Sequence, residues 1–452
     1  MVAQSTQDNV IVAPLPPLVP GLPILGNALG MRNDPLSYLL ACYHQYGSIY
    51  RIKLLNKTVT VMGGLGANQF LARSGEDHFL NGEMFRGFAA ELGTLQFLNG
   101  LDGPLHKTRR KAVRRSHGRE NLQARLAETI RLTREYVSQW PEGQTVAILD
   151  TIQRMVVHQL GLILVNQAPG AKFEAFRTLM YTNLQVNIKG IWPRLMLRHP
   201  TYLSAKAQAN ALGRQIVADH RQYPPTDRPV DLVDELINEV DDDGNHLPEE
   251  VILAETVGSF NSGLDTLSNT ICFILYGILH TPELLARVTA EVDALFADGL
   301  NDLQAIKDAS SLHYAAMEAM RLYPVAPLTY RTVSDSFVFD GYRVEQGSHV
   351  FIANTITHYL PEYFPNPERF DVDRYNEGIA KSRPANVWTP YTLGAHTCLG
   401  AGLAESLALV AVATILHTIE FKPLSETFKV HLNPIPSLGR RFALHVIRHR
   451  HS

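Results

Sequence analysis

Cysteine is scarce in this chain of 452 residues, and no sign of charge dominates it. The three cysteines, Cys42, Cys272 and Cys398, are too few and too widely separated to form a disulfide framework. The formal net charge is only −3, so bulk electrostatics give no indication of nucleic-acid binding. We therefore expect a protein of a reducing compartment without a nucleic-acid partner.

Targeting signals and long apolar runs are also missing. Residues 1–14 are polar and mixed, without the positively charged start and apolar core of a signal peptide. The sequence has no proline-free run of 18 uncharged apolar residues, so no transmembrane anchor is predicted. We expect a cytoplasmic protein that is at most peripherally attached to a membrane.

Internal repeats and low-complexity linkers are absent, although the length would suffice for two or three average domains. Hydrophobic residues make up 45% and charged residues 19% of the chain, which is an ordinary globular balance. The simplest prediction is one domain over residues 1–452, mainly α with a minor β part. Residues 1–30 are predicted to form an extended segment, because the stretch LPPLVPGLPILGNAL is too rich in proline for a regular helix.

Periodicity and turn signals predict the order of the elements. Helices are expected at 34–46, over most of 66–296, and at 303–322 with a break near Ser310. Loops are expected at 82–103 and 223–229. Strands are expected as hairpins at 48–62 and 336–353, and as two short runs between 428 and 449.

One stretch, PYTLGAHTCLG at 390–400, carries a chemical signal. A glycine-containing loop leads to Cys398, and an apolar helix over 403–416 is predicted to follow. Unpaired N–H groups and the helix dipole would favour the thiolate. A lone thiolate is a poor zinc site but a good axial ligand for haem iron. Gly394 and Gly400 would let the backbone approach a flat cofactor. The alternative for an isolated cysteine is a buried core residue.

The same stretch resembles the haem-binding loop of the cytochrome P-450 family, Phe-x-x-Gly-x-x-x-Cys-x-Gly. Four residues match in spacing: Gly394, His396, Cys398 and Gly400. Tyr391 replaces the usual Phe, and Thr392 replaces a common Gly, which bears on the tuning of the iron. The resemblance to soluble bacterial members implies the P-450 fold, with haem b between the long central helix and the helix after the cysteine loop. It also implies Cys398 as the axial ligand.

The long central helix is predicted over 248–279, with Pro248 at its first position. Its middle, NSGLDT at 261–266, is polar within an apolar sequence. Thr266 can bond the carbonyl four residues back and bend the helix, opening it near Ser262 to water or a ligand. The alternative is an exposed polar stripe. The block resembles the family's oxygen-activating Ala/Gly-Gly-x-Asp/Glu-Thr motif, which implies that Thr266 organises water and Asp265 helps to deliver protons.

Two further groups match family positions. Glu318 and Arg321 lie at i and i+3, which alone would indicate a surface ion pair. With the segment Pro-Glu-Arg-Phe that contains Arg369, the resemblance implies a buried structural network of Glu318, Arg321 and Arg369. The resemblance also implies that the haem propionates are bound by His106, Arg110, Arg331 and His396.

A basic run surrounds Arg110 in the sequence. We expect Arg110 to point inward, while the remaining cations form a positive patch where an acidic electron donor could dock. These cations are Lys107, Arg109, Lys111, Arg114 and Arg115.

Apolar residues at positions that line the substrate pocket in the family predict a lipophilic substrate, such as a terpenoid, a steroid or a fatty acid. The candidates, of which all but Ser262 are apolar, are Phe85, Phe88, Leu92, Phe97, Phe260, Ser262, Val325, Leu328 and Leu438. For any single one, core packing is at least as common a role. Residues 188–200 have a composition that suits either a membrane-facing access lid or a simple loop.

The predicted function is that of a haem-thiolate monooxygenase (EC 1.14), hydroxylating its substrate with O2 and two electrons. The sequence has no flavin or iron–sulfur motif, so the electrons are expected from separate proteins, a ferredoxin and its reductase. A monomer is expected. The alternatives are a peroxide-dependent or peroxide-rearranging haem-thiolate enzyme and a non-enzymatic haem or lipid carrier. The pair of Asp265 and Thr266 argues against both alternatives.

Overall fold

The computed structural model describes residues 12–226, 228–240, 244–297, 299–376, 378, 381–432 and 435–451. The chain divides into two compact units that alternate along the sequence. The first unit comprises Met1–Met84, Arg321–Cys398 and Leu432–Pro436, and the second comprises Phe85–Met320, Leu399–His431 and Ser437–Ser452. Most of the described chain is helical and the sheets are small, so the predicted fold class is confirmed.

A five-stranded sheet forms the centre of the first unit, in the order β1-β2-β8-β5-β3. Strands β2 and β8 are parallel, and the other neighbours are antiparallel. The strands of this unit, with the separate hairpin of β6 and β7, are β1 (Ile49–Leu54), β2 (Lys57–Gly63), β3 (Phe79–Leu80), β5 (Thr329–Val333), β6 (Phe337–Phe339), β7 (Tyr342–Val344) and β8 (His349–Ala353).

The hairpin predicted over 48–62 is confirmed. The prediction over 336–353 is confirmed for β6 and β7 but wrong for β8, which pairs with β2 and β5 instead. Turn chemistry explains the two confirmed hairpins. Asp340 and Gly341, between β6 and β7, both have positive φ angles, 49° and 79°, as a two-residue type I′ turn requires. Leu55 between β1 and β2 also has a positive φ of 56°. Strands β3 and β5 were not predicted, because β3 has only two residues and β5 follows a helix closely.

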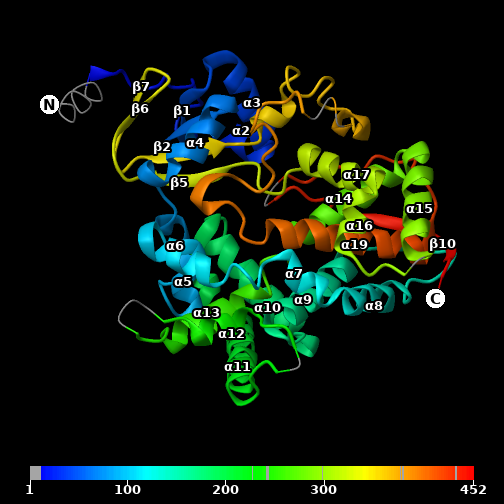
Figure 1. Ribbon diagram of the computed structural model, residues 1–452. Coiled ribbons are helices and arrows are strands. Elements are labelled where there is room, and N and C mark those ends of the chain that lie inside the picture. The colour runs from blue at the N-terminus through cyan, green and yellow to red at the C-terminus, as the bar shows by residue number, and fades with distance from the viewer. Residues whose placement is uncertain are drawn as a thin grey trace. The chain divides into compact units, whose positions relative to one another are not determined.

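The helices of the first unit are short, and α3 and α4 contact the sheet (Figure 1). They are α2 (Ala28–Asn33), α3 (Pro35–Tyr46), α4 (Gly64–His78), η5 (Ile356–Tyr359), η6 (Val372–Tyr375) and η7 (Gly394–His396). Helix α3 begins as predicted, because the Asp34 carboxylate accepts a hydrogen bond from the Ser37 amide at 3.0 Å.

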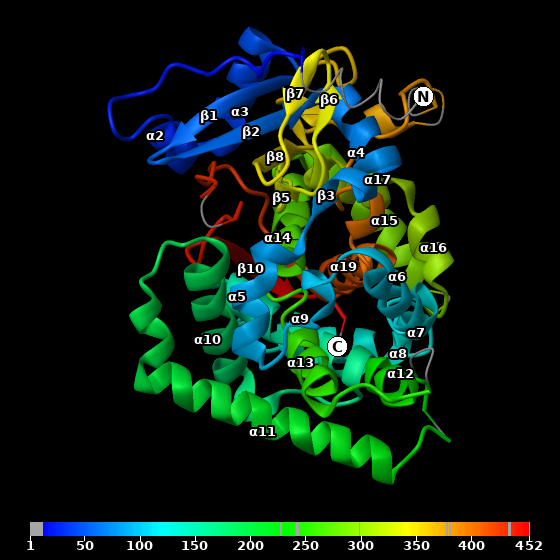
Figure 2. The same cartoon turned by 90° about the vertical axis from the view of Figure 1, so that its left-hand side faces the viewer.

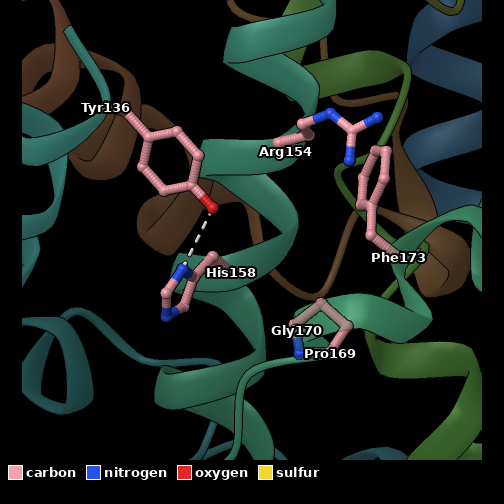
Figure 3. Close-up of a pocket in the computed structure, with 6 residues that line it drawn as sticks. All are labelled: Tyr136, Arg154, His158, Pro169, Gly170 and Phe173. Atoms are coloured by element: carbon pink, nitrogen blue, oxygen red, sulfur yellow. Dashed lines mark hydrogen bonds between the residues drawn. The ribbon is translucent and has the colours of Figure 1, made fainter. Parts of the chain in front are cut away.

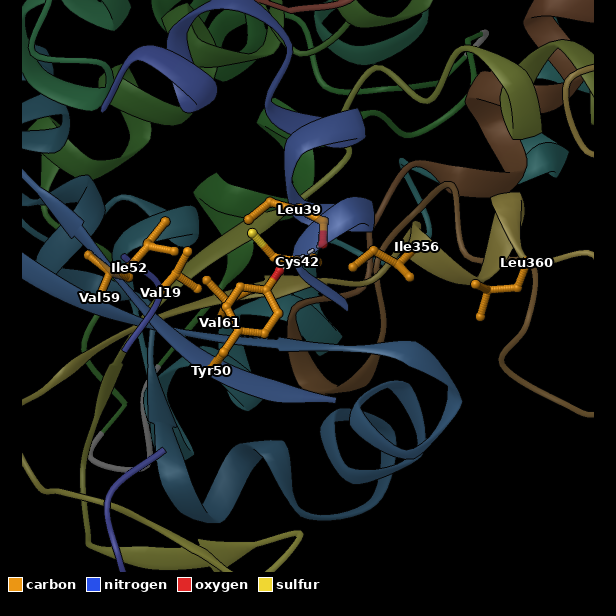
Figure 4. Close-up of a cluster of buried hydrophobic side chains, with 10 residues drawn as sticks. Val19, Leu39, Cys42, Tyr50, Ile52, Val59, Val61, Ile356 and Leu360 are labelled. Atoms are coloured by element: carbon orange, nitrogen blue, oxygen red, sulfur yellow. Dashed lines mark hydrogen bonds between the residues drawn. The ribbon is translucent and has the colours of Figure 1, made fainter. Parts of the chain in front are cut away.

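The core of the first unit joins the N-terminal segment to α3 and the sheet (Figure 4). Val19 is buried, and its amide donates to the Arg51 carbonyl at 2.9 Å. The Tyr50 hydroxyl donates to the Leu39 carbonyl at 2.8 Å. The predicted extended segment therefore lies on the first unit from its described start to α2.

The second unit is built from helices and one three-stranded sheet of order β4-β10-β9. Its elements, of which α5 begins and α17 ends in the first unit, are α5 (Gly82–Leu92), η1 (Leu98–Gly100), α6 (Gly103–Ala112), α7 (Arg119–Gln123), α8 (Leu126–Val137), β4 (Thr145–Ala147), α9 (Leu149–Val165), η2 (Gly170–Lys172), α10 (Phe173–Asn183), the π-helical turn η3 (Leu184–Ile188), η4 (Arg194–Arg198), α11 (Pro200–Gln222), α12 (Leu232–Asn238), α13 (Glu249–Ser259), α14 (Thr266–Leu279), α15 (Pro282–Ala297), α16 (Leu303–Asp308), α17 (Ser310–Leu322), α19 (Ala401–Thr418), β9 (Ile419–Phe421) and β10 (Ala443–His449).

Helix α19 is the core helix of the second unit and packs against α8, α14 and α15. Nearly every side chain from Leu403 to Leu416 is buried. Within the described residues, α19 with the turn before it is long and apolar enough to span a membrane, but 67% of that stretch is buried inside the protein. Its apolar composition is therefore explained by packing. On another side of this unit, α11 packs against both α10 and α13 (Figure 2).

Three predictions about the elements need correction. Residues 82–103 are not a loop, because they contain α5 and η1. Residues 248–279 form two helices, α13 and α14, and Pro248 is the N-cap rather than the first helical residue. Between 428 and 449, β10 is the one described strand. The predicted break near Ser310 is confirmed, since α16 ends at Asp308 and α17 begins at Ser310.

Candidate functional site

Cys398 differs from the other two cysteines in exposure. Cys42 and Cys272 are buried, whereas Cys398 is exposed. Burial raises the pKa of the Cys42 and Cys272 thiols, which keeps both protonated and unreactive. The alternative of a buried core cysteine is therefore wrong for Cys398. Its amide donates to the Tyr391 carbonyl at 3.0 Å, which closes the loop around Gly394.

Backbone conformation explains the glycine and the threonine of this loop. Gly394 has a φ of +76°, and a Cβ there would lie 2.6 Å from the Leu71 carbonyl oxygen in α4. Contact with α4 thus requires a glycine at this position, whatever binds the loop. Thr392 has a φ of +59°, and its buried hydroxyl has no partner among the described residues. The left-handed conformation accounts for the glycine that is common there in the family.

Buried polar side chains of the first unit hold the segment that leads to the cysteine loop. Each bonds a main-chain group of residues 386–389: Asn68 Nδ2 to Asn386 O at 2.9 Å, Thr357 Oγ1 to Val387 O at 2.7 Å, Asn354 Nδ2 to Thr389 O at 3.0 Å, and Thr389 N to His358 Nε2 at 2.8 Å. Burial, with the charge of Arg321, lowers the pKa of His358 to about 3. The imidazole is therefore neutral, and its Nδ1–H donates to the Arg321 carbonyl. No sequence pattern predicted this network.

The predicted scaffold residues lie on α17, and their burial is confirmed. Glu318 and Arg321 are both 0% exposed. Arg321 donates to the His358 carbonyl at 2.8 Å and to the Arg369 carbonyl at 3.2 Å. The Arg369 side chain is exposed, so the prediction of its burial is wrong. The buried guanidinium of this segment is Arg374, which donates to the Arg369 carbonyl at 3.3 Å.

The remaining candidates of the first unit lie on β5 and in the cysteine loop. Arg331 on β5 is 5% exposed, and its Nη1 donates to Asn81 Oδ1 at 2.7 Å and to the Tyr330 carbonyl at 2.8 Å. These bonds fix a buried cation, which suits the binding of a carboxylate. Tyr391 and His396 are half-buried. Their contact with a cofactor remains a prediction.

Helix α6 of the second unit presents a different arginine to the interior than the sequence predicted. His106 is 3% exposed and Arg109 is 1% exposed, while Arg110 is half-buried. Arg109 Nε bonds Glu239 Oε1 at 2.9 Å. The prediction that Arg109 belongs to the positive patch is therefore wrong, because it lies three residues from His106 on the inward face. The patch consists of Lys107, Lys111, Arg114 and Arg115, which are exposed.

The polar block between α13 and α14 interrupts the helix as the side chain of Thr266 predicts. Thr266 Oγ1 donates to the Ser262 carbonyl at 3.1 Å, and the Ser268 amide reaches back five residues to Gly263 at 3.3 Å. The regular ladder is therefore open at Ser262. Ser262 and Thr266 are exposed, whereas Gly263 packs against Leu160 of α9. At the break between α13 and α14, one side thus packs on α9, and the other side exposes the hydroxyl groups of Ser262 and Thr266.

The Asp265 carboxylate is held by a side chain that no sequence pattern indicated. Gln153 Nε2 on α9 donates to Asp265 Oδ1 at 3.0 Å. Burial raises the pKa of Asp265, although the charge of Lys189 opposes this shift. Lys189 follows the π-helical turn η3, and burial lowers the pKa of its ammonium to about 8. An acid with a raised pKa beside an alcohol is suited to proton transfer.

Three of the predicted pocket residues form one aromatic cluster. Phe85 and Phe88 have ring centroids 6.2 Å apart, and Phe88 and Phe97 have centroids 5.9 Å apart. Phe97 covers Gly258 of α13, where a Cβ would lie 2.7 Å from its ring. The cluster thus lies beside the turn of α13 that precedes Ser262.

The other pocket candidates are distributed differently. Phe260 is 0% exposed and packs against Phe176 at a centroid distance of 4.4 Å, so it lies in the core beside α10, and its contact with a substrate remains a prediction. Leu92 and Leu438 are buried in the second unit. Val325 and Leu328 are half-buried in the first unit.

A small surface pocket of about 50 Å³ in the second unit contains none of these candidates (Figure 3). The Tyr136 hydroxyl lies 3.1 Å from His158 Nδ1, and the Arg154 guanidinium lies 4.5 Å from the centre of the Phe173 ring. The space is enough for a few water molecules and too small for a drug-sized lipophilic ligand.

Each unit, taken by itself, offers donor groups of the types that suit a haem. The exposed Cys398 thiol can provide the axial thiolate, and buried Arg331 and His106 can bind carboxylates. Cys42 and Cys272, buried and protonated, are unsuited to the ligand role. Asp265, whose pKa is raised by burial, and Thr266, whose hydroxyl donates to the Ser262 carbonyl, remain the predicted acid and alcohol.

Comparisons with known proteins agree with this chemistry. The sequence profile of the family described as Cytochrome P450 matches residues 16–440. A sterol 14alpha-demethylase of Mycolicibacterium vanbaalenii is 26% identical over 412 residues, covering 88% of this chain and 89% of the relative. A cyclooctat-9-en-7-ol 5-monooxygenase of Streptomyces melanosporofaciens is 26% identical over 423 residues, covering 90% and 85%.

Solved structures show the same fold. The retinoic acid-bound cyanobacterial CYP120A1 superposes with a TM-score of 0.81 at 21% identity, covering 96% of this chain and 99% of that chain. The heme domain of cytochrome P450DA gives a TM-score of 0.84 at 20% identity, covering 97% and 99%. From the match over residues 16–440, the chain belongs to the cytochrome P450 family and is a haem-dependent monooxygenase.

Proposed function

We propose that this cytochrome P450 monooxygenase hydroxylates a terpenoid or steroid of low polarity. The observation that carries the proposal is the cluster of Phe85, Phe88 and Phe97 beside α13. Aromatic rings supply large apolar contact area with little conformational freedom to lose. Relatives named for a sterol and for cyclooctat-9-en-7-ol support this substrate class over a fatty acid.

We propose the following roles for the chain's own residues. Cys398 would hold the haem iron, Arg331, His106, Arg110 and His396 would bind its propionates, and the haem would supply the activation of O2. Its approach to the cysteine loop also involves Gly400, where a Cβ would meet no protein atom closer than 3.9 Å.

The acid–alcohol pair then moves protons. Gln153 holds Asp265 Oδ1 at 3.0 Å, so Asp265 Oδ2 is the oxygen that passes a proton onward. Burial raises the pKa of Asp265, which brings proton transfer closer to neutral pH. Thr266 holds water at the open ladder beside Ser262, and the aromatic cluster excludes bulk water from the substrate side.

Electrons come from a separate ferredoxin with its reductase. The exposed cations Lys107, Lys111, Arg114 and Arg115 would attract an acidic donor and raise its association rate. We also propose that residues 1–452 act as one domain, as a monomer in the cytoplasm.

Spectral titration tests the substrate class. The purified holoenzyme is titrated with matched terpenoid, steroid and fatty-acid panels while the Soret band is followed. A shift with terpenoids or steroids is expected, weakened by Phe97→Ala but not by Phe176→Leu, which changes the core beside Phe260. A response restricted to fatty acids would overturn the substrate class. Turnover with peroxide alone, with no gain from a ferredoxin system, would overturn the use of O2 in favour of the peroxide-dependent alternative.

A further inference from the structure

A carboxylate and two imidazoles converge in the second unit, outside the residues assigned above. Asp293 on α15, His417 on α19 and His451 each offer one ligand atom, and these atoms lie within 4.8 Å of one another. The Arg450 amide donates to the Thr418 carbonyl at 2.8 Å, which brings His451 back to the end of α19. Three segments that are distant in sequence therefore meet at one point.

Two of the polar atoms in this cluster are unsatisfied. Asp293 Oδ1 and His417 Nδ1 are buried and have no hydrogen-bond partner among the described residues. Leaving a buried polar atom unpaired destabilises a protein, so these two atoms favour a bound partner. The other carboxylate oxygen, Asp293 Oδ2, accepts from Arg450 Nη2 at 2.6 Å, so the carboxylate is oriented while Oδ1 is available.

The imidazoles are held by stacking. The His417 ring stacks on Phe296 with centroids 4.2 Å apart and on His451 with centroids 4.3 Å apart. Phe296 in turn carries the Arg134 guanidinium at 5.3 Å from its centroid. The positive charges of Arg134 and Arg450 lower the affinity for a cation, so a site here binds its metal moderately rather than tightly.

A second cluster of the same residue types differs, because its ligand atoms already have hydrogen-bond partners. His220, Asp231 and Asp234 also converge. There Arg228 donates to both oxygens of Asp234 at 2.6 and 2.9 Å, and His220 bonds Asp231 through Nε2 and the Ile216 carbonyl through Nδ1. That cluster is a satisfied ion-pair network, whereas the cluster at Asp293 has unused ligand atoms.

We propose that Asp293, His417 and His451 bind a zinc ion, which fastens the C-terminal segment to α15 and α19. Two imidazole nitrogens and one carboxylate oxygen form a ligand set that zinc accepts, with water completing the coordination. The ligand atoms move closer together when the ion binds, which the exposed His451 allows. The proposal is independent of the substrate class proposed above.

Zinc titration of the full-length holoenzyme against a competing chromogenic chelator tests the site. We expect one zinc ion per chain, with a dissociation constant raised roughly tenfold or more in Asp293→Asn, His417→Gln and His451→Gln. His445→Gln is the matched control, because His445 lies on β10, the strand that precedes His451, and bonds Thr145 instead of the cluster.

The variants also distinguish the loss of a zinc-binding side chain from a general loss of folding. His451 is exposed, so His451→Gln cannot fail through core packing. With zinc, hydrogen exchange at the C-terminal residues is expected to slow in the wild type and not in His451→Gln. Absence of zinc binding, or equal loss of binding in His445→Gln, would overturn the proposal and leave a bridging water as the partner of the unsatisfied atoms.

Discussion

Glu255 on α13 offers the sharpest test of the electrostatics of the second unit. The side chain is 8% exposed, and its Oε1 accepts from the Leu98 amide at 2.5 Å. Burial raises the pKa of Glu255 from 4.5 to about 7, although the charge of Arg109 opposes the shift. The carboxylate therefore fastens η1, next to Phe97, at an energetic cost when it is ionised.

The magnitude and its pH window follow from linkage. Between pH 4.5 and 7 the folded protein keeps the Glu255 proton that the unfolded chain has lost, so stability falls as the pH rises through this window. The full shift corresponds to about 3 kcal/mol. Glu255→Gln keeps an oxygen for the Leu98 amide and removes the charge. We expect it to stabilise the protein by about 3 kcal/mol above pH 7 and to have no such effect below pH 4.5.

Thermal unfolding followed by circular dichroism at several pH values measures this difference. For a chain of this length, about 3 kcal/mol corresponds to roughly 3 °C in the midpoint. Glu239→Gln is the contrasting control, because it weakens the buried pair with Arg109 at 2.9 Å and should destabilise the protein at neutral pH. A constant difference between Glu255→Gln and wild type at all pH values would refute the argument.

The remaining predictions concern the haem side and the scaffold. Cys398→Ser should abolish the red-shifted Soret band of the reduced, CO-bound protein, whereas Cys272→Ser should keep it; an unchanged band in Cys398→Ser would exclude thiolate ligation by Cys398. Thr266→Ala should still bind substrate but lose about tenfold in product per electron, or about 1.4 kcal/mol, with hydrogen peroxide measured in place of product; unchanged coupling would contradict the role of the hydroxyl. Glu318→Ala removes a fully buried carboxylate beside Arg321 on α17 and should cost roughly 3–5 kcal/mol; normal haem content and thermal midpoint would contradict a structural role.

Local rules predicted the elements that local chemistry determines. The Asp340-Gly341 turn and the N-cap Asp34 specify their own geometry, and Thr266 bends its own helix through the Ser262 carbonyl. The α5 helix was missed because it contains two glycines, Gly82 and Gly87, which lower its propensity. Whether such a segment forms a helix depends on its tertiary packing, which the sequence of the segment alone does not indicate.

The errors in the arginines have a common origin. On a helix, neighbouring residues point about 100° apart, so a shift of one position separates buried Arg109 from Arg110, which the sequence predicted to point inward. In the segment after α17, the buried arginine is Arg374 and not Arg369. The carbonyls of Pro365 and Arg369 accept hydrogen bonds from the Arg374 guanidinium, which fixes it in the interior. Charge and spacing thus limit the candidates for the buried arginine to a few residues, and tertiary contacts determine which of them is buried.

The groups that tune the reactive atoms come from parts of the chain that a motif does not cover. Gln153 lies 112 residues from Asp265 in sequence, and Asn68 lies 318 residues from Asn386, whose carbonyl it binds. Both are ordinary amides within helices, with no spacing relation to the atoms they hold. A motif therefore identifies which atoms react, while the pKa of the acid and the path of the cysteine loop depend on contacts that only the folded chain brings together. Variation at positions such as Gln153 can thus change the proton chemistry while every motif residue stays the same.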